Sequence, residues 1–127
     1  MTMKILIVDD SVFSQKVNAR FIEQFLTDVE IFFANDGEEG FERYKEIKPD
    51  YVLLDLLMPK LNGKELISLI KHHDEKAKII VISADIQKNV REDIRNYRVM
   101  EFINKPFNEE KAKALCDLIR NDSNGRG

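Results

Sequence analysis

Cysteine, long hydrophobic runs and an excess of positive charge are nearly absent from this sequence, and each absence excludes a class of protein. The 127 residues include one cysteine, Cys116, so an internal disulfide cannot form. Cys116 lies on an apolar stripe at helical spacing (Ala112, Leu115, Cys116, Ile119), which predicts a place in the core. The apolar run in MTMKILIVDD ends at two acids, which excludes a signal-peptide core and a membrane span. We therefore expect a cytoplasmic protein with no membrane insertion.

The charge balance argues against a nucleic-acid-coating surface. Lysine and arginine number 20 against 23 aspartates and glutamates, the net charge is −3, and the isoelectric point is near 5.5. We expect no direct binding to nucleic acid. The length suits one domain, which we place at residues 1–120, and the polar segment NDSNGRG at 121–127 is expected to be a flexible tail or the beginning of a linker.

Apolar runs alternate regularly with amphipathic stretches. The predicted strands are 4–8, 30–34, 51–55, 78–83 and 101–103, and the predicted helices are 11–26, 37–47, 63–73, 86–96 and 108–120. Ser11, Asp36 and Asn108 are expected near three helix starts. The central strands are apolar enough to be covered on both faces. This pattern predicts an α/β fold with a single five-stranded parallel sheet, doubly wound by five helices.

Asp55 interrupts the apolar run YVLLDLLMPK, and a buried carboxylate without compensation costs several kcal/mol. In open parallel sheets the functional crevice lies at the carboxyl ends of the strands. Five side chains follow or end predicted strands there: Asp9, Asp10, Asp55, Ser83 and Lys105. Taken singly, paired acids also suit a solvated helix start, and a lysine before proline also suits a surface loop. Although they are spread over almost the whole sequence, the predicted fold brings all five to one edge of the sheet.

Four blocks carry a family resemblance, in order and at family spacing: ILIVDDS at 5–11, DLLMPKLNG at 55–63, VISA at 81–84 and NKPF at 104–107. On this basis the chain resembles the receiver domain of two-component response regulators, which is CheY-like and has a flavodoxin-like fold. The resemblance implies that Asp55 accepts a phosphoryl group. It also implies that Asp9, Asp10, Asp55 and the backbone carbonyl of Leu57 hold Mg2+ or Mn2+.

The same resemblance assigns roles around the phosphoryl group. It implies that Ser83 and Lys105 contact phosphoryl oxygens, that Ser83 and Phe102 form a switch pair, and that Pro106 makes a cis-proline turn. Phe102 lacks the hydroxyl of a tyrosine, so any change in its rotamer would be driven by packing, and an ordinary core phenylalanine is the competing interpretation.

Four positions vary within the family or depart from it. Arg98 and Val99 stand where the family usually has glycine and alanine. The resemblance implies that Leu57 and Asp85 occupy the two variable positions that tune access of water to the phosphoryl group.

The function that the resemblance implies is phosphoryl transfer from a histidine kinase or phosphotransfer protein to Asp55, without an enzymatic activity on other substrates. Phosphorylation would switch binding of a protein effector to the face formed by 86–96, 101–103 and 108–120, and a CheC- or CheX-type phosphatase is a further expected partner. A stand-alone, chemotaxis-like regulator is the favoured interpretation. The alternatives are a receiver fragment of a larger regulator with a DNA-binding or enzymatic output, and a phosphate sink or relay intermediate. An aspartate-nucleophile phosphatase is disfavoured, because such enzymes place an acid where this chain has Leu57.

Overall fold

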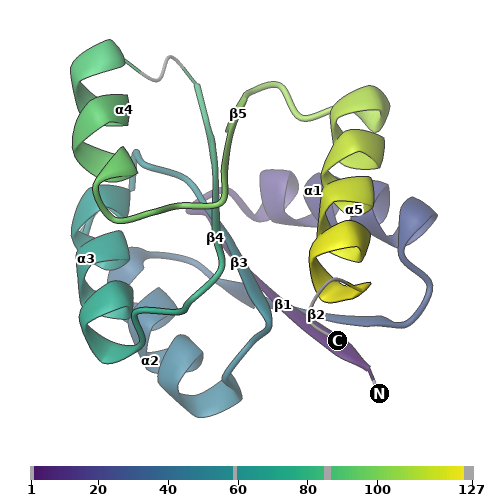
Figure 1. The fold of residues 1–127 in the computed structure, drawn as a ribbon, viewed down its shortest axis with the longest axis horizontal. Helices are drawn as coiled ribbons and strands as arrows, with labels where there is room; N and C mark the ends of the chain where they lie inside the picture. The colour runs from purple at the N-terminus through teal and green to yellow at the C-terminus, as the bar shows by residue number, and fades with distance from the viewer. Residues whose placement is uncertain (1, 59, 85–86, 125–127) are drawn as a thin grey trace.

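The fold is a parallel sheet covered by helices on both faces, seen in a computed structural model that describes residues 2–58, 60–84 and 87–124. The sheet order is β2-β1-β3-β4-β5, and all four strand pairs are parallel. The strands are β1 (Met3–Val8), β2 (Val29–Ala34), β3 (Tyr51–Leu54), β4 (Ile79–Ser83) and β5 (Glu101–Asn104). The predicted fold class is confirmed (Figure 1).

The helices follow the strands in alternation, and most of their bounds lie within two residues of the predicted ones. They are α1 (Val12–Phe25), α2 (Gly37–Ile47), α3 (Gly63–His73), α4 (Lys88–Arg95) and α5 (Glu109–Asn124). Side-chain oxygens of Ser11, Asp36 and Asn108 accept the backbone N–H three residues later, as the predicted starts require. Asn62 and Glu65 add a reciprocal capping box at α3.

The hydrophobic core has two layers, one on each face of the sheet. Along β1 the side chains alternate, so that Ile5 and Ile7 pack in the layer beneath α1 and α5, whereas Leu6 and Val8 pack in the layer beneath α2, α3 and α4. Figure 1 shows α1 and α5 together on one side and the other helices opposite. Burial on both faces explains why the central strands are continuously apolar.

The last helix is longer than predicted, and this corrects the expected tail. The prediction ended the helix at residue 120, whereas α5 continues to Asn124. The additional turn is held to the sheet because the Tyr51 hydroxyl donates to Asp122 at 2.6 Å and Lys78 pairs with Asp122 at 3.4 Å. Residues 121–124 are therefore helical, while 125–127 lie outside the described residues. Cys116 is buried as predicted, and burial raises the pKa of its thiol to about 11.

Candidate functional site

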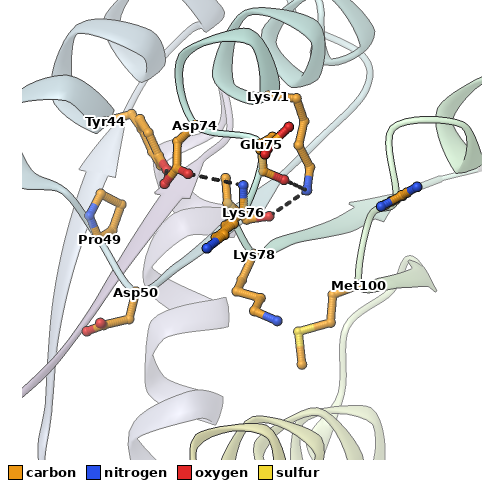
Figure 2. Close-up of a pocket in the computed structure, with 11 residues that line it drawn as sticks. Tyr44, Pro49, Asp50, Lys71, Asp74, Glu75, Lys76, Lys78 and Met100 are labelled. Carbon is orange, nitrogen blue, oxygen red and sulfur yellow. Dashed lines mark hydrogen bonds between the residues drawn. The ribbon is translucent and has the colours of Figure 1, made fainter. Parts of the chain in front are cut away.

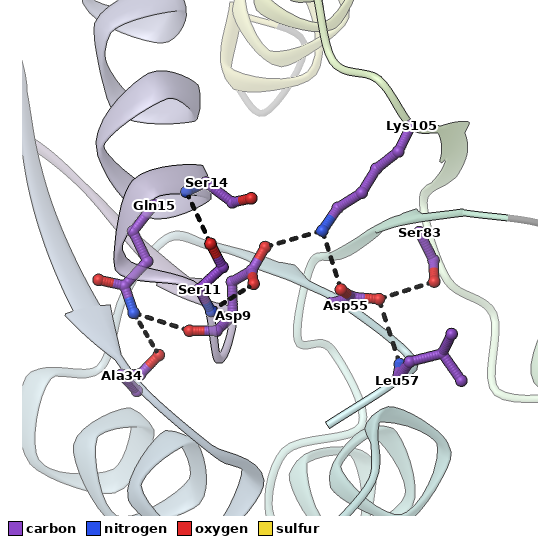
Figure 3. A network of polar contacts seen from close by, with 9 residues as sticks. All are labelled: Asp9, Ser11, Ser14, Gln15, Ala34, Asp55, Leu57, Ser83 and Lys105. Atoms are coloured by element: carbon purple, nitrogen blue, oxygen red, sulfur yellow. Dashed lines mark hydrogen bonds and ion pairs between the residues drawn. The ribbon is translucent and has the colours of Figure 1, made fainter. Parts of the chain in front are cut away.

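The structure brings five predicted site residues together at the carboxyl edge of the sheet: Asp10, which lies beside Asp9 and Asp55, and the four that end or follow a strand directly. Asp9 follows β1, Asp55 follows β3, Ser83 ends β4, and Lys105 follows β5. Parallel pairing aligns these strand ends, so residues up to 96 positions apart in sequence make direct contacts. Figure 3 shows the resulting network, centred on Asp55 and Lys105.

Asp55 is buried, with 8% of its surface exposed, and both of its carboxylate oxygens are satisfied. Oδ1 accepts a hydrogen bond from the Ser83 hydroxyl at 2.7 Å and another from the backbone N–H of Leu57 at 3.1 Å. Oδ2 accepts from the Lys105 ammonium at 2.9 Å. These hydrogen bonds and the ion pair with Lys105 offset the free-energy cost of burying the Asp55 carboxylate at the end of an apolar strand.

The Lys105 ammonium bridges two carboxylates, lying 2.9 Å from Asp55 Oδ2 and 3.0 Å from Asp9 Oδ2. Burial alone would lower the pKa of this lysine, but its hydrogen bonds to Asp55 and Asp9 and the charges of both acids raise that pKa above its ordinary value of 10.5. Lys105 is therefore fully protonated at neutral pH and supplies the positive charge within the site.

Asp9, Asp10 and Asp55 form an acid cluster whose ligand atoms all lie within 4.8 Å of one another. Asp9 and Asp55 are buried, whereas Asp10 is exposed to solvent. Hard divalent cations prefer carboxylate oxygens, so the donor chemistry and the spacing fit Mg2+ or Mn2+. The Lys105 ammonium lies between two of these acids and reduces the repulsion between their negative charges, which a bound cation would reduce further.

The remaining predicted residues lie around this network. Phe102 is half-buried on β5, and the guanidinium carbon of Arg91 lies 5.4 Å from the centre of its ring. The peptide bond between Lys105 and Pro106 is cis, as the resemblance implied. The Leu57 side chain is 70% exposed at the rim of the site. Asp85 lies outside the described residues.

Gln15 is a buried residue that the sequence analysis did not select. Its side-chain nitrogen lies 2.7 Å from the backbone oxygen of Asp9, 3.2 Å from that of Ala34 and 2.8 Å from Asn35 Oδ1. Gln15 thus ties α1 to the ends of β1 and β2 and fixes the backbone that carries Asp9 (Figure 3). The sequence feature that could have identified Gln15 is its position as a polar residue on the inward face of a predicted amphipathic helix.

Comparison with known proteins identifies the family. The model of the response regulator receiver domain matches residues 5–117, and this chain belongs to that family. The chain is 37% identical to the chemotaxis protein CheY of Thermotoga maritima over 119 residues, which cover 94% of this chain and 98% of that protein. It is also 31% identical to a probable C4-dicarboxylate response regulator, DctR, of Halalkalibacterium halodurans, with 88% of this chain aligned, but it spans only 49% of that protein.

Solved structures agree with the family assignment. The response regulator domain of Thermotoga maritima CheB superposes with a TM-score of 0.84 at 29% identity, covering 98% of each chain. The CheX-CheY-BeF3-Mg+2 complex from Borrelia burgdorferi superposes with a TM-score of 0.84 at 32% identity, covering 94% of this chain and 88% of that chain. Within residues 2–58, 60–84 and 87–124, no helix is long and apolar enough to cross a membrane.

Proposed function

We propose that Asp55 accepts a phosphoryl group from a histidine kinase or phosphotransfer protein, and that the modification changes the affinity of this receiver for a protein partner. The observation that carries the proposal is the environment of Asp55. Its carboxylate lies at a strand end, held by Ser83 and Lys105, beside two further acids that suit a divalent cation. We infer a signalling role in the cytoplasm, without enzymatic turnover of other substrates.

In the proposed step, a carboxylate oxygen of Asp55 attacks phosphorus and forms an acyl phosphate. The phosphorus–nitrogen bond of the donor phosphohistidine breaks, and the electron pair of that bond leaves with the imidazole. The Ser83 hydroxyl and the Lys105 ammonium, which now bind Asp55, are close enough to transfer their hydrogen bonds to the new phosphoryl oxygens. Mg2+ or Mn2+, held by Asp9, Asp10, Asp55 and the backbone carbonyl of Leu57, would supply positive charge to the incoming phosphoryl oxygens.

The proposed output surface is the face formed by α4, β5 and α5. Its β5–α5 side has a hollow of about 440 Å³, lined by Glu101, Phe102, Ile103, Asn104, Lys111, Ala114, Leu115 and Leu118. Phe102 belongs both to this hollow and to the proposed switch pair with Ser83, so a change of its rotamer would alter the hollow. Because Arg91 lies over the Phe102 ring, that change would also disturb α4.

One partner assignment rests on a solved structure of a related complex. The CheX-CheY complex supports a CheC- or CheX-type phosphatase as a partner for this chain.

The full-length similarity to a CheY favours a stand-alone, chemotaxis-like regulator. The half-length match to DctR favours the second candidate, a receiver joined to an output domain. Capture of partners with beryllofluoride-treated protein distinguishes both from a phosphate sink, which would capture a phosphoryl donor but no effector.

The test of the proposed chemistry is incubation with acetyl phosphate and Mg2+, followed by intact-mass measurement. We expect the mass of one added phosphoryl group in the wild type and none in Asp55→Asn. Asp28→Asn is the matched control, because Asp28 is an exposed acid at the opposite edge of the sheet. An unmodified wild type, or an adduct that persists in Asp55→Asn, overturns the assignment.

A further inference from the structure

A hollow of about 790 Å³ lies at the amino ends of β3, β4 and β5, at the edge of the sheet opposite Asp55. It is lined by Tyr44, Pro49, Asp50, Lys71, Asp74, Glu75, Lys76, Ala77, Lys78, Arg98 and Met100. An adjoining hollow of about 480 Å³ shares Lys71, Glu75, Lys76 and Arg98 with it. The larger volume falls in the range of small-molecule sites. Figure 2 shows the lysines grouped between Tyr44 and Met100.

Positive side chains outnumber negative ones in the larger hollow, and two of the acids are already engaged. Four cationic residues line it: Lys71, Lys76, Lys78 and Arg98. Asp74 accepts hydrogen bonds from the Tyr44 hydroxyl at 3.3 Å and from the backbone N–H of Lys76 at 3.0 Å. Asp50 accepts from the backbone N–H of Lys4 at 2.8 Å. Four cations thus face three acids (Asp50, Asp74 and Glu75) in the lining, and one of the cations, Lys78, pairs with Asp122 at 3.4 Å outside it. Lys71, Lys76 and Arg98 form no salt bridge with any residue that the structure describes.

Lys71 is held in place by neutral groups. Its ammonium donates to the backbone oxygens of Ala77 at 2.7 Å and Glu75 at 3.3 Å, and within the described part of the chain it forms no salt bridge (Figure 2). Burial lowers the pKa of Lys71, and the charges of Lys78 and Arg98 lower it further against the opposing effect of Asp74. Lys78 and Arg98 therefore repel the ammonium of Lys71, and an anion bound beside Lys71 would relieve that repulsion.

Arg98 has a backbone conformation that favours glycine, with φ at 57°. The side chain of Arg98 forms no hydrogen bond or ion pair with any residue that the structure describes, so no such contact offsets the backbone strain. Non-glycine residues with a strained backbone are found most often at functional sites, where binding by the side chain can outweigh the free-energy cost of the strain. A guanidinium offers planar, paired donors that match phosphoryl oxygens.

We propose that this hollow is a binding site for a small phosphorylated molecule. Arg98 and Lys71 would contact phosphoryl oxygens, Lys76 and Lys78 would add positive charge, and Pro49 and Met100 would contact the remainder of the ligand. Paired phosphoryl groups suit four grouped cations better than a single carboxylate does, because their charge is higher. The site is independent of phosphorylation at Asp55.

The test is titration of isotope-labelled protein with pyrophosphate, and separately with ATP, followed by backbone-amide NMR shifts in the presence of chelator. We expect shifts at 76–78 and 98–100, and none at Asp55 or Ser83. Affinity should fall at least tenfold in Lys71→Met and in Arg98→Gly. Arg98→Gly also relieves the strained φ, so it should melt no lower than the wild type, and its loss of binding cannot be attributed to unfolding.

Lys16→Met is the matched control, because Lys16 is an exposed lysine on α1 that lines neither hollow. It should bind as the wild type does. The absence of shifts at millimolar ligand, shifts confined to the Asp55 edge, or equal affinity in Arg98→Gly would each overturn the proposal. Sedimentation with anionic phospholipid vesicles, without binding of pyrophosphate or ATP, would also overturn it, since the phosphoryl groups would then come from a membrane surface.

Discussion

Replacement of Lys105 by methionine should expose the electrostatic conflict within the acid cluster. The substitution keeps a chain of similar length but removes the ammonium that lies 2.9 Å from Asp55 and 3.0 Å from Asp9. Asp9 and Asp55 are both buried, with 4% and 10% of their side chains exposed, so water can replace the lost charge only in part. Asp9 and Asp55 would then face each other and Asp10 without an intervening cation.

The size of the effect follows from the geometry. Charges about 3 Å apart attract by roughly 5 to 6 kcal/mol at an effective dielectric constant near 20, before desolvation is subtracted. Removal of one partner from a buried ion pair costs about 3–5 kcal/mol. Because 24% of the Lys105 side chain is exposed, we expect the lower end, about 3 kcal/mol of unfolding free energy. For a chain of this length that corresponds to a melting temperature lower by about 10 °C.

The assay is unfolding by urea and by heat, followed by circular dichroism because the chain has no tryptophan, in chelator and in saturating Mg2+. With Mg2+ the difference between variant and wild type should shrink to about 1 kcal/mol, since the acids regain a cation, and Mg2+ should bind more tightly to the variant. Lys113→Met, at an exposed position on α5, is the control. Equal stability in chelator, or an equal deficit with and without Mg2+, would refute the reasoning.

The pH dependence has a definite sign. The pKa of Lys105 is raised in the folded protein, so its contribution is complete below the unfolded value near 10.5 and is lost as pH rises through the higher folded pKa. The stability difference between wild type and Lys105→Met should therefore stay constant from pH 7 to about 9 and shrink only above about 10.5. A difference that disappeared below pH 9 would contradict the raised pKa.

Three further predictions concern other residues. Asp10→Asn should melt higher than wild type in chelator and gain little from Mg2+, whereas a lower melting temperature in chelator would make Asp10 a structural residue. Gly63→Ala should lose about 3 kcal/mol in urea unfolding, because its Cβ would lie 2.5 Å from the backbone oxygen of Asp55; a near-neutral effect would contradict this close contact. Burial, and then the neighbouring Asp74, raise the pKa of Tyr44 to about 12, so the late-ionising part of an ultraviolet titration should decrease in Tyr44→Phe, and an unchanged titration curve would contradict the raised pKa.

The fold class and the edge of the sheet that carries the site follow from the sequence alone. Continuous apolar strands separated by amphipathic segments predict a two-sided parallel sheet, and parallel pairing brings the residues after each strand to one edge. Asp9, Asp55, Ser83 and Lys105 could therefore be selected before any distance was known. Local capping chemistry also predicted the starts of α1, α2 and α5 at Ser11, Asp36 and Asn108, because each cap depends only on neighbouring residues.

Which of these groups contact one another depends on the tertiary structure. Sequence spacing cannot show that Lys105 bridges Asp9 and Asp55, because that contact depends on strand register and side-chain rotamers over 96 residues of chain. The added turn of α5 has the same origin, since Tyr51 on the central strand binds Asp122. The sequence shows that Arg98 departs from the family pattern. The cationic hollow could not be predicted from the sequence, because it forms only where the loops before β4 and β5 lie close together. Long-range packing, which no local pattern encodes, sets these distances.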